Sequence, residues 1–257
     1  ETNDLSWVII FQTSTLSPMQ VLLRSNYTSG AGSPSGHKTF WGSYITDNSN
    51  ITTISHIRNS NNSFQQGSHV FGSGNTNSLI TINENTSSFK SYANGSLIAN
   101  VSGTNTTPNG HNFTILGSDS YVDDLAQRAF TGYISEVHVY SEALNSAKRI
   151  ILDNYLSTKY NISIGSADRY SYDATYGNEL AGIGREDVNN EHLDATGESI
   201  FRVTAASLDD NDYLMWGHNN GNLSSTSTGI PTTFFVFGKI LERKWRFSET
   251  NETGDLT

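Results

Sequence analysis

The chain has 257 residues, a formal net charge of −10 and no cysteine. This length is enough for one large β domain or two smaller ones with a substantial core. The negative charge disfavours nucleic acid and anionic membrane surfaces as partners, because both bind through clustered Lys and Arg. The absence of cysteine excludes disulfides and zinc sites with thiolate ligands.

The residue composition is typical of extracellular β proteins. Asn, Ser, Thr and Gly are abundant, whereas only 16% of the residues are charged. No apolar run reaches the ~18 residues that a membrane-spanning helix needs, so we expect no membrane insertion. Residues 1–4 lack the basic start and apolar block of a signal peptide, so a secreted form would have lost that segment or would carry it upstream.

Residues 1–144 predict about nine short strands separated by polar turns, which is typical of a sandwich or jelly roll. The predicted strand regions are residues 7–14, 19–25, 37–46, 51–58, 68–74, 78–83, 88–103, 112–118 and 133–140. Asn94 and Gly95 lie between two strand-like runs. They predict a two-residue hairpin turn, because both turn positions require positive φ.

The apolar pattern changes after Tyr140, where a predicted strand runs directly into a predicted helix. Ala147, Ile150 and Ile151 fall at helical spacing rather than in alternation. Asn145 is the predicted N-cap, since its side chain can accept a hydrogen bond from the first helical turn. The pattern therefore predicts a single helix in a strand-rich chain.

The residues beyond this helix predict a second β unit. Its predicted strand regions are residues 198–208, 212–220 and 232–250. Residues 168–187 are rich in Gly, Asp and Tyr, and we interpret them as a structured loop or irregular hairpin. Alternation in the last region predicts that one face carries Leu241, Arg243, Trp245 and Phe247, with Trp245 in the core.

The predicted fold class is therefore all-β. It comprises a jelly-roll sandwich over residues 1–144, a linking helix over residues 145–160, and a second, smaller β module over residues 161–257.

Two motifs in the first domain carry a resemblance to a known family. Residues 92–97 (YANGSL) resemble the hairpin, and residues 130–144 (FTGYISEVHVYSEAL) the C-terminal strand, of LamG-like, concanavalin A-like jelly-roll domains of bacterial surface proteins. The segments ILDNYLSTKYNI, DATYGNELAGIGRED, DYLMWGHNN and RKWRFSET resemble the β module that accompanies this domain in large adhesins of Bacteroidetes-type bacteria.

This resemblance implies a secreted, multi-domain cell-surface protein, and it does not imply a catalytic activity. In such proteins another strand precedes the first predicted strand, and the second module continues further. We therefore expect the chain to be a piece of a longer protein that lacks its N-terminal strand and the C-terminal end of the second module.

No catalytic motif is found in the sequence. Concanavalin-like glycosidases usually carry paired carboxylates on one strand as E-x-D-x-x-E, because hydrolysis needs an acid and a nucleophile or base. Glu136 has only His138 near it on its strand, and we interpret the two as a solvent-facing pair. Gly182 and Gly184 lack the third glycine of a dinucleotide-binding loop, and we interpret them as permitting a tight turn. The prediction is that the protein is not an enzyme.

Calcium is the one cofactor for which the sequence offers candidate ligands. Asp173, Asn178, Glu179 and Asp187 lie in one oxygen-rich segment, and calcium takes six to eight oxygen ligands from loops. Two further acidic groups are residues 209, 210 and 212 and residues 119, 123 and 124. The alternative is that each group is a solvated acidic turn, since none has EF-hand spacing.

Eleven Asn-x-Ser/Thr sequons are candidate glycosylation sites. They are Asn26, Asn50, Asn61, Asn85, Asn94, Asn100, Asn105, Asn112, Asn161, Asn222 and Asn251. In a host with N-glycosylation they predict a sugar-coated surface, whereas in a host without it they carry no meaning.

Sugar binding would require an aromatic face beside polar groups. The candidate aromatic residues are Trp41, Tyr44, Tyr121 and Trp216, and the alternative for each is a position in the core or on a sheet face. The ligand and the residues that bind it stay undetermined.

Three functional hypotheses follow. The first is the non-enzymatic extracellular region of a cell-surface adhesin, in which the chain binds a glycan or another surface protein or acts as a spacer. The second is a structural subunit that builds a filament or sheath with copies of itself by strand addition at an open sheet edge. The third is a carbohydrate-binding module of a larger secreted hydrolase.

Overall fold

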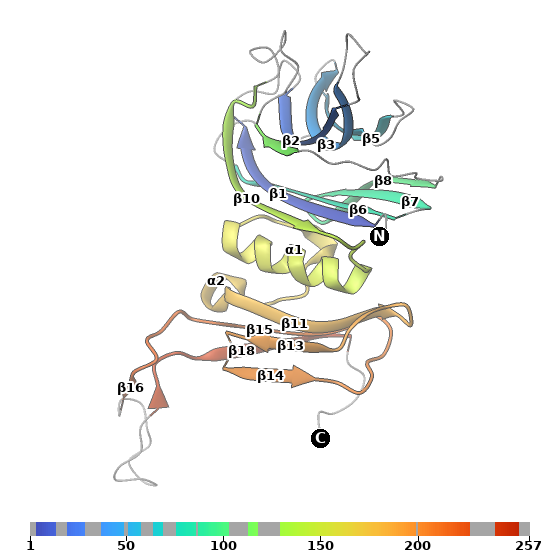
Figure 1. The fold of residues 1–257 in the computed structure, drawn as a ribbon. Coiled ribbons are helices and arrows are strands. Elements are labelled where there is room, and N and C mark those ends of the chain that lie inside the picture. The colour runs from blue at the N-terminus through green and yellow to red at the C-terminus, as the bar shows by residue number, and fades with distance from the viewer. Residues whose placement is uncertain are drawn as a thin grey trace, which may run out of the picture. The chain divides into compact units, whose positions relative to one another are not determined.

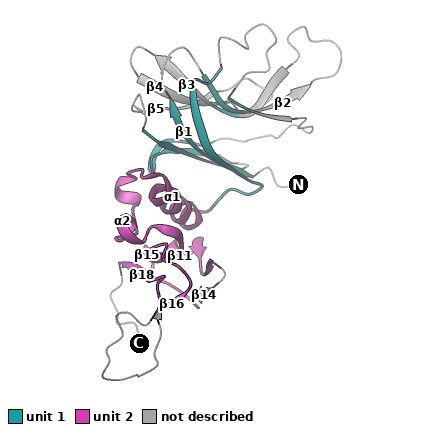
Figure 2. Cartoon of the chain, turned by 90° about the vertical axis from the view of Figure 1, so that its left-hand side faces the viewer, with its two compact units in different colours: residues 1–144 teal, residues 145–257 magenta. Residues whose placement is uncertain are grey.

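The computed structural model describes residues 4–13, 20–28, 37–48, 51–57, 64–68, 76–85, 87–102, 113–117, 129–198, 200–226 and 240–251. The chain forms two compact units, residues 1–144 and 145–257 (Figure 2). Most of the described residues are in strands, which confirms the predicted all-β class. Within the described ranges, no helix is both long and apolar enough to cross a membrane.

The first unit consists of two antiparallel five-stranded sheets (Figure 1). Its strands are β1 (Leu5–Thr13), β2 (Gln20–Thr28), β3 (His37–Asn48), β4 (Ile51–Ile57), β5 (Phe64–Ser68), β6 (Ser78–Glu84), β7 (Ser88–Ala93), β8 (Ser96–Ser102), β9 (Phe113–Leu116) and β10 (Gly132–Tyr140). One sheet has the order β10-β1-β6-β7-β8, and the other has the order β5-β4-β3-β2-β9. The predicted sandwich is confirmed, although β5 lies at Phe64–Ser68 and not over the predicted residues 68–74.

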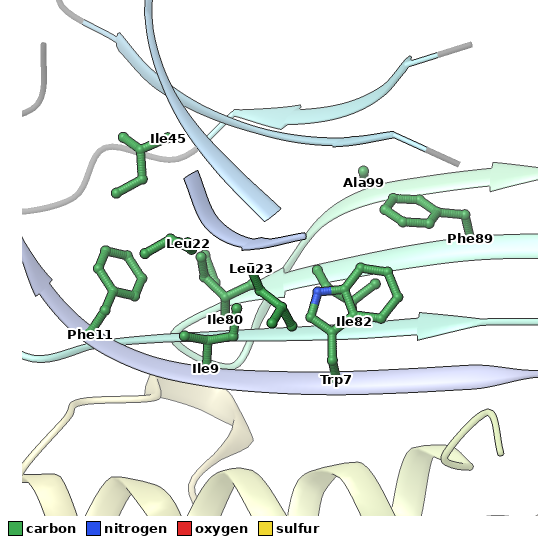
Figure 3. Packing of buried hydrophobic residues seen from close by; sticks show 11 residues of the cluster. Trp7, Ile9, Phe11, Leu22, Leu23, Ile45, Ile80, Ile82, Phe89 and Ala99 are labelled. Carbon is green, nitrogen blue, oxygen red and sulfur yellow. The ribbon is translucent and has the colours of Figure 1, made fainter. Parts of the chain in front are cut away.

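The core of this unit lies between the two sheets (Figure 3). Alternate residues of β1, namely Trp7, Ile9 and Phe11, point into it and are fully buried. The indole nitrogen of Trp7 donates a 2.6 Å hydrogen bond to Ser43 Oγ on β3, which belongs to the opposite sheet. Strand β1 is a continuous apolar run in which Val8 and Ile10 are also fully buried. Its core-facing residues supply both packing and a polar contact between the sheets.

The predicted hairpin at Asn94 and Gly95 is confirmed. Both residues have positive φ, 45° and 76°, and they connect β7 to β8. Asn94 Oδ1 also accepts a 2.8 Å hydrogen bond from the backbone nitrogen of Leu79. The turn therefore sets the β7–β8 register and is attached to β6 as well.

The second unit combines one helix with a four-stranded sheet of order β12-β11-β15-β18 and two small two-stranded sheets, β13-β14 and β16-β17. Its elements are α1 (Ser146–Tyr160), the 3₁₀ turn η1 (Gly165–Ala167), α2 (Asp173–Tyr176), β11 (Asn178–Asp187), β12 (Asn190–His192), β13 (Asp194–Gly197), β14 (Phe201–Thr204), β15 (Asp212–His218), β16 (Ser225–Thr226), β17 (Ile240–Leu241) and β18 (Trp245–Thr250).

Helix α1 has an asparagine cap at each end, and the first of these was predicted from the sequence. Asn145 Oδ1 accepts a 2.9 Å hydrogen bond from the backbone nitrogen of Lys148, which confirms the predicted N-cap. Asn161 ends the helix in the left-handed conformation, with φ of 54°. The core of the unit lies between α1 and the central strands, and it contains Ala147, Ile150, Tyr170, Leu180, Tyr213 and Met215. The helix is thus part of the second unit's core.

Residues 168–187 are predicted from the sequence to form a structured loop or an irregular hairpin. The loop alternative is wrong for residues 178–187, because they form β11 in the middle of the sheet, where it pairs with β12 in an irregular antiparallel ladder. A Cβ added to Gly184 would lie 2.2 Å from the Tyr213 ring, and one added to Gly182 would lie 3.0 Å from Met215 Cγ. The two glycines therefore make room for large side chains on β15 rather than for a tight turn.

The predicted buried face of the last strand region is also wrong. Phe247 and Leu241 are 48% and 44% exposed, whereas Ser248 on the opposite face of β18 is buried. The covered face of β18 is the polar one, because Ser248 Oγ contacts Ser171 and the Arg246 guanidinium lies over the Tyr176 ring. Residues 232–239 of this region lie outside the described ranges.

Two buried tyrosines predict that the second unit loses stability in alkali. Burial raises the pKa of Tyr170 to about 12. Burial also raises the pKa of Tyr213, and so do the hydrogen bond that its hydroxyl donates to Glu186 and the negative charge of that carboxylate. Above pH 10 the unfolded chain releases these protons while the folded chain retains them. We expect full stability below about pH 10 and a progressive loss between about pH 10 and 12.

This prediction is checked by urea unfolding of the chain at a series of pH values from 8 to 12. Tyr170→Phe is expected to flatten the alkaline slope, because one proton fewer is released on unfolding. Tyr133→Phe is the control, since that side chain is 72% exposed in the first unit. An alkaline slope that is the same in all three proteins would contradict the prediction.

Candidate functional site

A polar pocket of about 220 Å³ lies on the second unit. It is lined by the end of α1, by α2 and by the start of β11. The lining residues are Tyr155, Thr158, Lys159, Asp173, Ala174, Thr175, Gly177, Asn178 and Glu179. Two carboxylates, an ammonium group, hydroxyls and an amide therefore surround one small volume.

The backbone around this pocket is closely packed. A Cβ added to Gly177 would lie 2.5 Å from the Asp173 carbonyl oxygen and 3.1 Å from Thr158 Cβ. Only glycine therefore lets the chain pass between α2 and α1 at this point. Asn178 Nδ2 donates a 3.0 Å hydrogen bond to the His218 carbonyl, which attaches the start of β11 to β15. These contacts hold the pocket walls in place without a ligand.

Glu179 has an unusual backbone conformation for its residue type. Its φ is 48°, in the left-handed region, where a side chain costs roughly 1–2 kcal/mol. It lies in an irregularity of the ladder, where β11 advances three residues from Asn178 to Ala181 against two on β15. Such bulges redirect a side chain and are frequent beside binding sites. No hydrogen bond or ion pair joins the Glu179 carboxylate to any residue that the structure describes.

Lys159 supplies the positive charge of the pocket lining. Its Nζ donates a 3.2 Å hydrogen bond to the Tyr155 hydroxyl. The same nitrogen lies 5.3 Å from the centre of the Tyr155 ring and 5.5 Å from that of Tyr160, which is within cation–π range. The aromatic rings therefore position the ammonium group on the helical side of the pocket.

The structure brings together three of the four residues predicted as calcium ligands. Asp173, Asn178 and Glu179 line the pocket, whereas Asp187 lies at the opposite end of β11. Nine residues of extended chain place Asn178 and Asp187 roughly 30 Å apart. The four residues therefore do not form one ion site. Among the described residues, no three His, Asp or Glu side chains are grouped so as to hold a metal ion.

The other predicted acidic groups do not change this result. Asp210 lies 2.9 Å from Arg185 Nε, and Asp212 Oδ2 accepts a 3.0 Å hydrogen bond from the backbone nitrogen of Asp209. These carboxylates are thus engaged in an ion pair and a turn. Residues 119, 123 and 124 lie outside the described ranges.

The predicted sugar-binding aromatic residues are only partly placed. Trp216 is fully buried, so its ring is part of the second unit's packing rather than a surface platform. The side chains of Trp41 and Tyr44, and the whole of Tyr121, fall outside what the structure describes. Trp245 lies beside His218, with ring centres 5.8 Å apart.

The described sequon asparagines are of two kinds. Asn85 and Asn94 use Oδ1 as a backbone acceptor, from Ser88 and Leu79 respectively, and are partly buried. The exposed ones are Asn100, Asn161, Asn222 and Asn251. The side chains of Asn26, Asn50, Asn61, Asn105 and Asn112 are outside the described set. Glycosylation itself stays a prediction.

The fold also assembles a Glu–His–Arg cluster that sequence reasoning missed. Arg243 Nη1 contacts both carboxylate oxygens of Glu198, at 2.6 and 2.5 Å, and the buried His218 Nε2 lies 3.2 Å from Glu198 Oε2. Glu198 too has a left-handed φ, 47°. The three residues come from separate segments, so no local spacing could have indicated the cluster. It joins the turn after β13 to the last residue of β15 and to the segment before β18.

Comparisons with known proteins give two family matches. A model of the concanavalin A-like lectin/glucanases superfamily matches residues 7–148, and a model of a domain of unknown function matches residues 148–257. No curated protein matches the chain.

Several solved structures are similar to parts of this chain at low identity. The Ruminococcus gnavus IT-sialidase CBM40 bound to α2,3-sialyllactose is 21% identical over 56% of this chain and 79% of its own, with a TM-score of 0.45. The heptameric SAP-like pentraxin from Limulus polyphemus is 15% identical over 56% and 66%, with a TM-score of 0.39. The leech intramolecular trans-sialidase is 15% identical over 84% and 29%, with a TM-score of 0.46.

Proposed function

The chain belongs to the concanavalin A-like lectin/glucanases superfamily through residues 7–148, and from this we propose that it is a non-enzymatic, carbohydrate-binding region of a cell-surface adhesin. Family membership is the observation that carries the proposal. The superfamily includes both sugar-binding and sugar-cleaving proteins, so the choice between them depends on the residues of this chain.

The residues favour binding over cleavage. Glycoside hydrolysis needs two carboxyl groups that face the same bond. The sequence has no E-x-D-x-x-E strand motif, and Glu136 on β10 lies 2.9 Å from His138. The predicted pair is therefore present, but its side chains are only 28% and 20% exposed, so it is not the solvent-facing pair that the sequence predicted. A lectin-like role requires no such carboxylate pair and agrees with these residues.

The extracellular location is supported by composition and by module order. The chain has few charged residues, no cysteine and many Asn, Ser and Thr residues. The concanavalin A-like domain is followed directly by a second matched module. This is also the order of the two modules in the large surface adhesins whose motifs this sequence resembles. A glycan or another surface protein is the partner that we propose for this region.

A glycan array probed with the labelled full chain tests the proposal. We expect selective retention on one group of related glycans, and loss of the signal when the free oligosaccharide is added. Heat-denatured chain is the control for non-specific adsorption. Sedimentation of the same sample distinguishes monomeric binding from avidity, because a polymer would indicate the filament role instead. A blank array at micromolar protein would rule out carbohydrate binding by this chain.

A further inference from the structure

We propose that the pocket on the second unit is a binding site for a single neutral saccharide residue, with the Glu179 carboxylate as its main hydrogen-bond acceptor. This inference rests on the proposed carbohydrate-binding function and assigns a site to the module that has no known function. It is argued from the size, the chemistry and the backbone of the pocket.

The size of the pocket restricts the ligand. Its volume of about 220 Å³ is below the roughly 300–1,000 Å³ of sites that enclose drug-sized molecules. It exceeds the volume of a few water molecules, each of which occupies about 30 Å³ of liquid. The pocket therefore suits one small polar molecule or one residue at the end of a chain.

The lining chemistry selects a neutral polyhydroxyl compound. Asp173 and Glu179 accept hydrogen bonds, Lys159 donates them, and Thr175 can do either. Each sugar hydroxyl can both donate and accept, so it suits such a mixed lining. An anion would be repelled by the two carboxylates. A calcium ion would find too few carboxylates and a lysine ammonium in the same lining.

Glu179 has the features of a ligand-binding residue. Among the described residues, seven non-glycine residues have positive φ; five are asparagine, and the two others are Glu179 and Glu198. Glu198 is stabilised in this conformation by Arg243, but the Glu179 carboxylate forms no hydrogen bond or ion pair with a described residue. Strained residues of this kind occur at ligand sites, where the strain positions a group for its partner. The bulge therefore presents an uncommitted acceptor beside the pocket.

The test uses the full chain and saturation-transfer NMR with a panel of methyl hexosides, followed by titration of those that bind. We expect Glu179→Gln to weaken binding about tenfold or more, because hydrogen bonds to a charged acceptor are about twice as strong as neutral ones. Glu242→Gln is the matched control, since this exposed carboxylate of the same unit is away from the pocket lining. It is expected to bind like the unaltered chain.

Glu179→Gly separates a binding role from a structural one. Glycine adopts positive φ without a steric penalty, so this variant is expected to retain or raise the melting temperature while losing the saccharide. A lower melting temperature together with unchanged binding would overturn the proposal, because Glu179 would then be structural.

The remaining outcomes distinguish this site from the wider function. If the chain binds glycans on the array but Glu179→Gln binds them with the same affinity, carbohydrate binding stands and the pocket assignment falls. If the chain binds neither the array nor the hexosides, both proposals fall. If calcium raises the melting temperature of the chain but not of Glu179→Gln, the pocket is a cation site and the saccharide assignment is overturned.

Discussion

Replacing Arg149 with alanine is expected to lower the free energy of unfolding of the second unit by about 3–5 kcal/mol. Arg149 Nη1 lies 2.5 Å from Asp153 Oδ2 within α1, and their side chains are only 7% and 0% exposed. Removing the guanidinium leaves the Asp153 carboxylate buried without its nearest positive charge. The loss therefore reflects an uncompensated charge in the core rather than the net strength of the ion pair.

Hydrogen exchange followed by mass spectrometry in increasing urea measures this effect separately in each unit. Peptides from α1 and β15 report on the second unit, and peptides from β1 and β6 report on the first. Arg202→Ala is the control, because Arg202 and Asp194 form an exposed pair, and little change is expected there. The double variant Arg149→Met/Asp153→Leu is expected to recover most of the protection, since no buried charge remains. Equal protection in Arg149→Ala and Arg202→Ala would contradict the prediction.

Replacing Trp7 with alanine is expected to destabilise the first unit by about 3–5 kcal/mol, as for other large-to-small core substitutions. Trp7 is fully buried between the sheets beside Ile82 and Phe89 (Figure 3). Its indole also donates the hydrogen bond to Ser43 that joins β1 to the opposite sheet. Alanine would leave a cavity and would remove this contact.

Urea unfolding of the full chain, with exchange measured in β1 and β6, checks the Trp7 prediction. Trp7→Phe is expected to have an intermediate effect, because it fills most of the cavity but has no N–H donor. Leu97→Ala changes a side chain that is 52% exposed, and its effect is expected to stay within about 0.5 kcal/mol. The prediction fails if Trp7→Ala and Leu97→Ala unfold at the same urea concentration.

The strands and turns of the first unit could largely be predicted from the sequence, because each depends on residues that are close together in the chain. The short apolar run of β1 and the Asn94-Gly95 turn each specify a conformation within a few residues of chain. The same holds for the N-cap at Asn145, whose side chain bonds three residues ahead. The family motifs added the order of the two modules.

The errors in the second unit have a common physical cause. Gly182 and Gly184 gave the appearance of a turn, but their role depends on the large side chains of β15 across the ladder. The alternating pattern of β18 predicts that the face carrying Phe247 is buried. In the structure the opposite face is covered instead, where Ser171 contacts Ser248. In each case the environment comes from a distant segment that local periodicity does not encode.

By itself, the sequence determined the fold class, the two-module order, most strands of the sandwich and the N-cap of α1, since propensity and capping act over a few residues. Only the tertiary structure decided which carboxylates meet. It separated Asp187 from Asp173 and Glu179, and it built the Glu198 cluster from three distant segments. Binding sites depend on such long-range contacts, because strand pairing and helix packing fix side-chain positions that the local sequence leaves open.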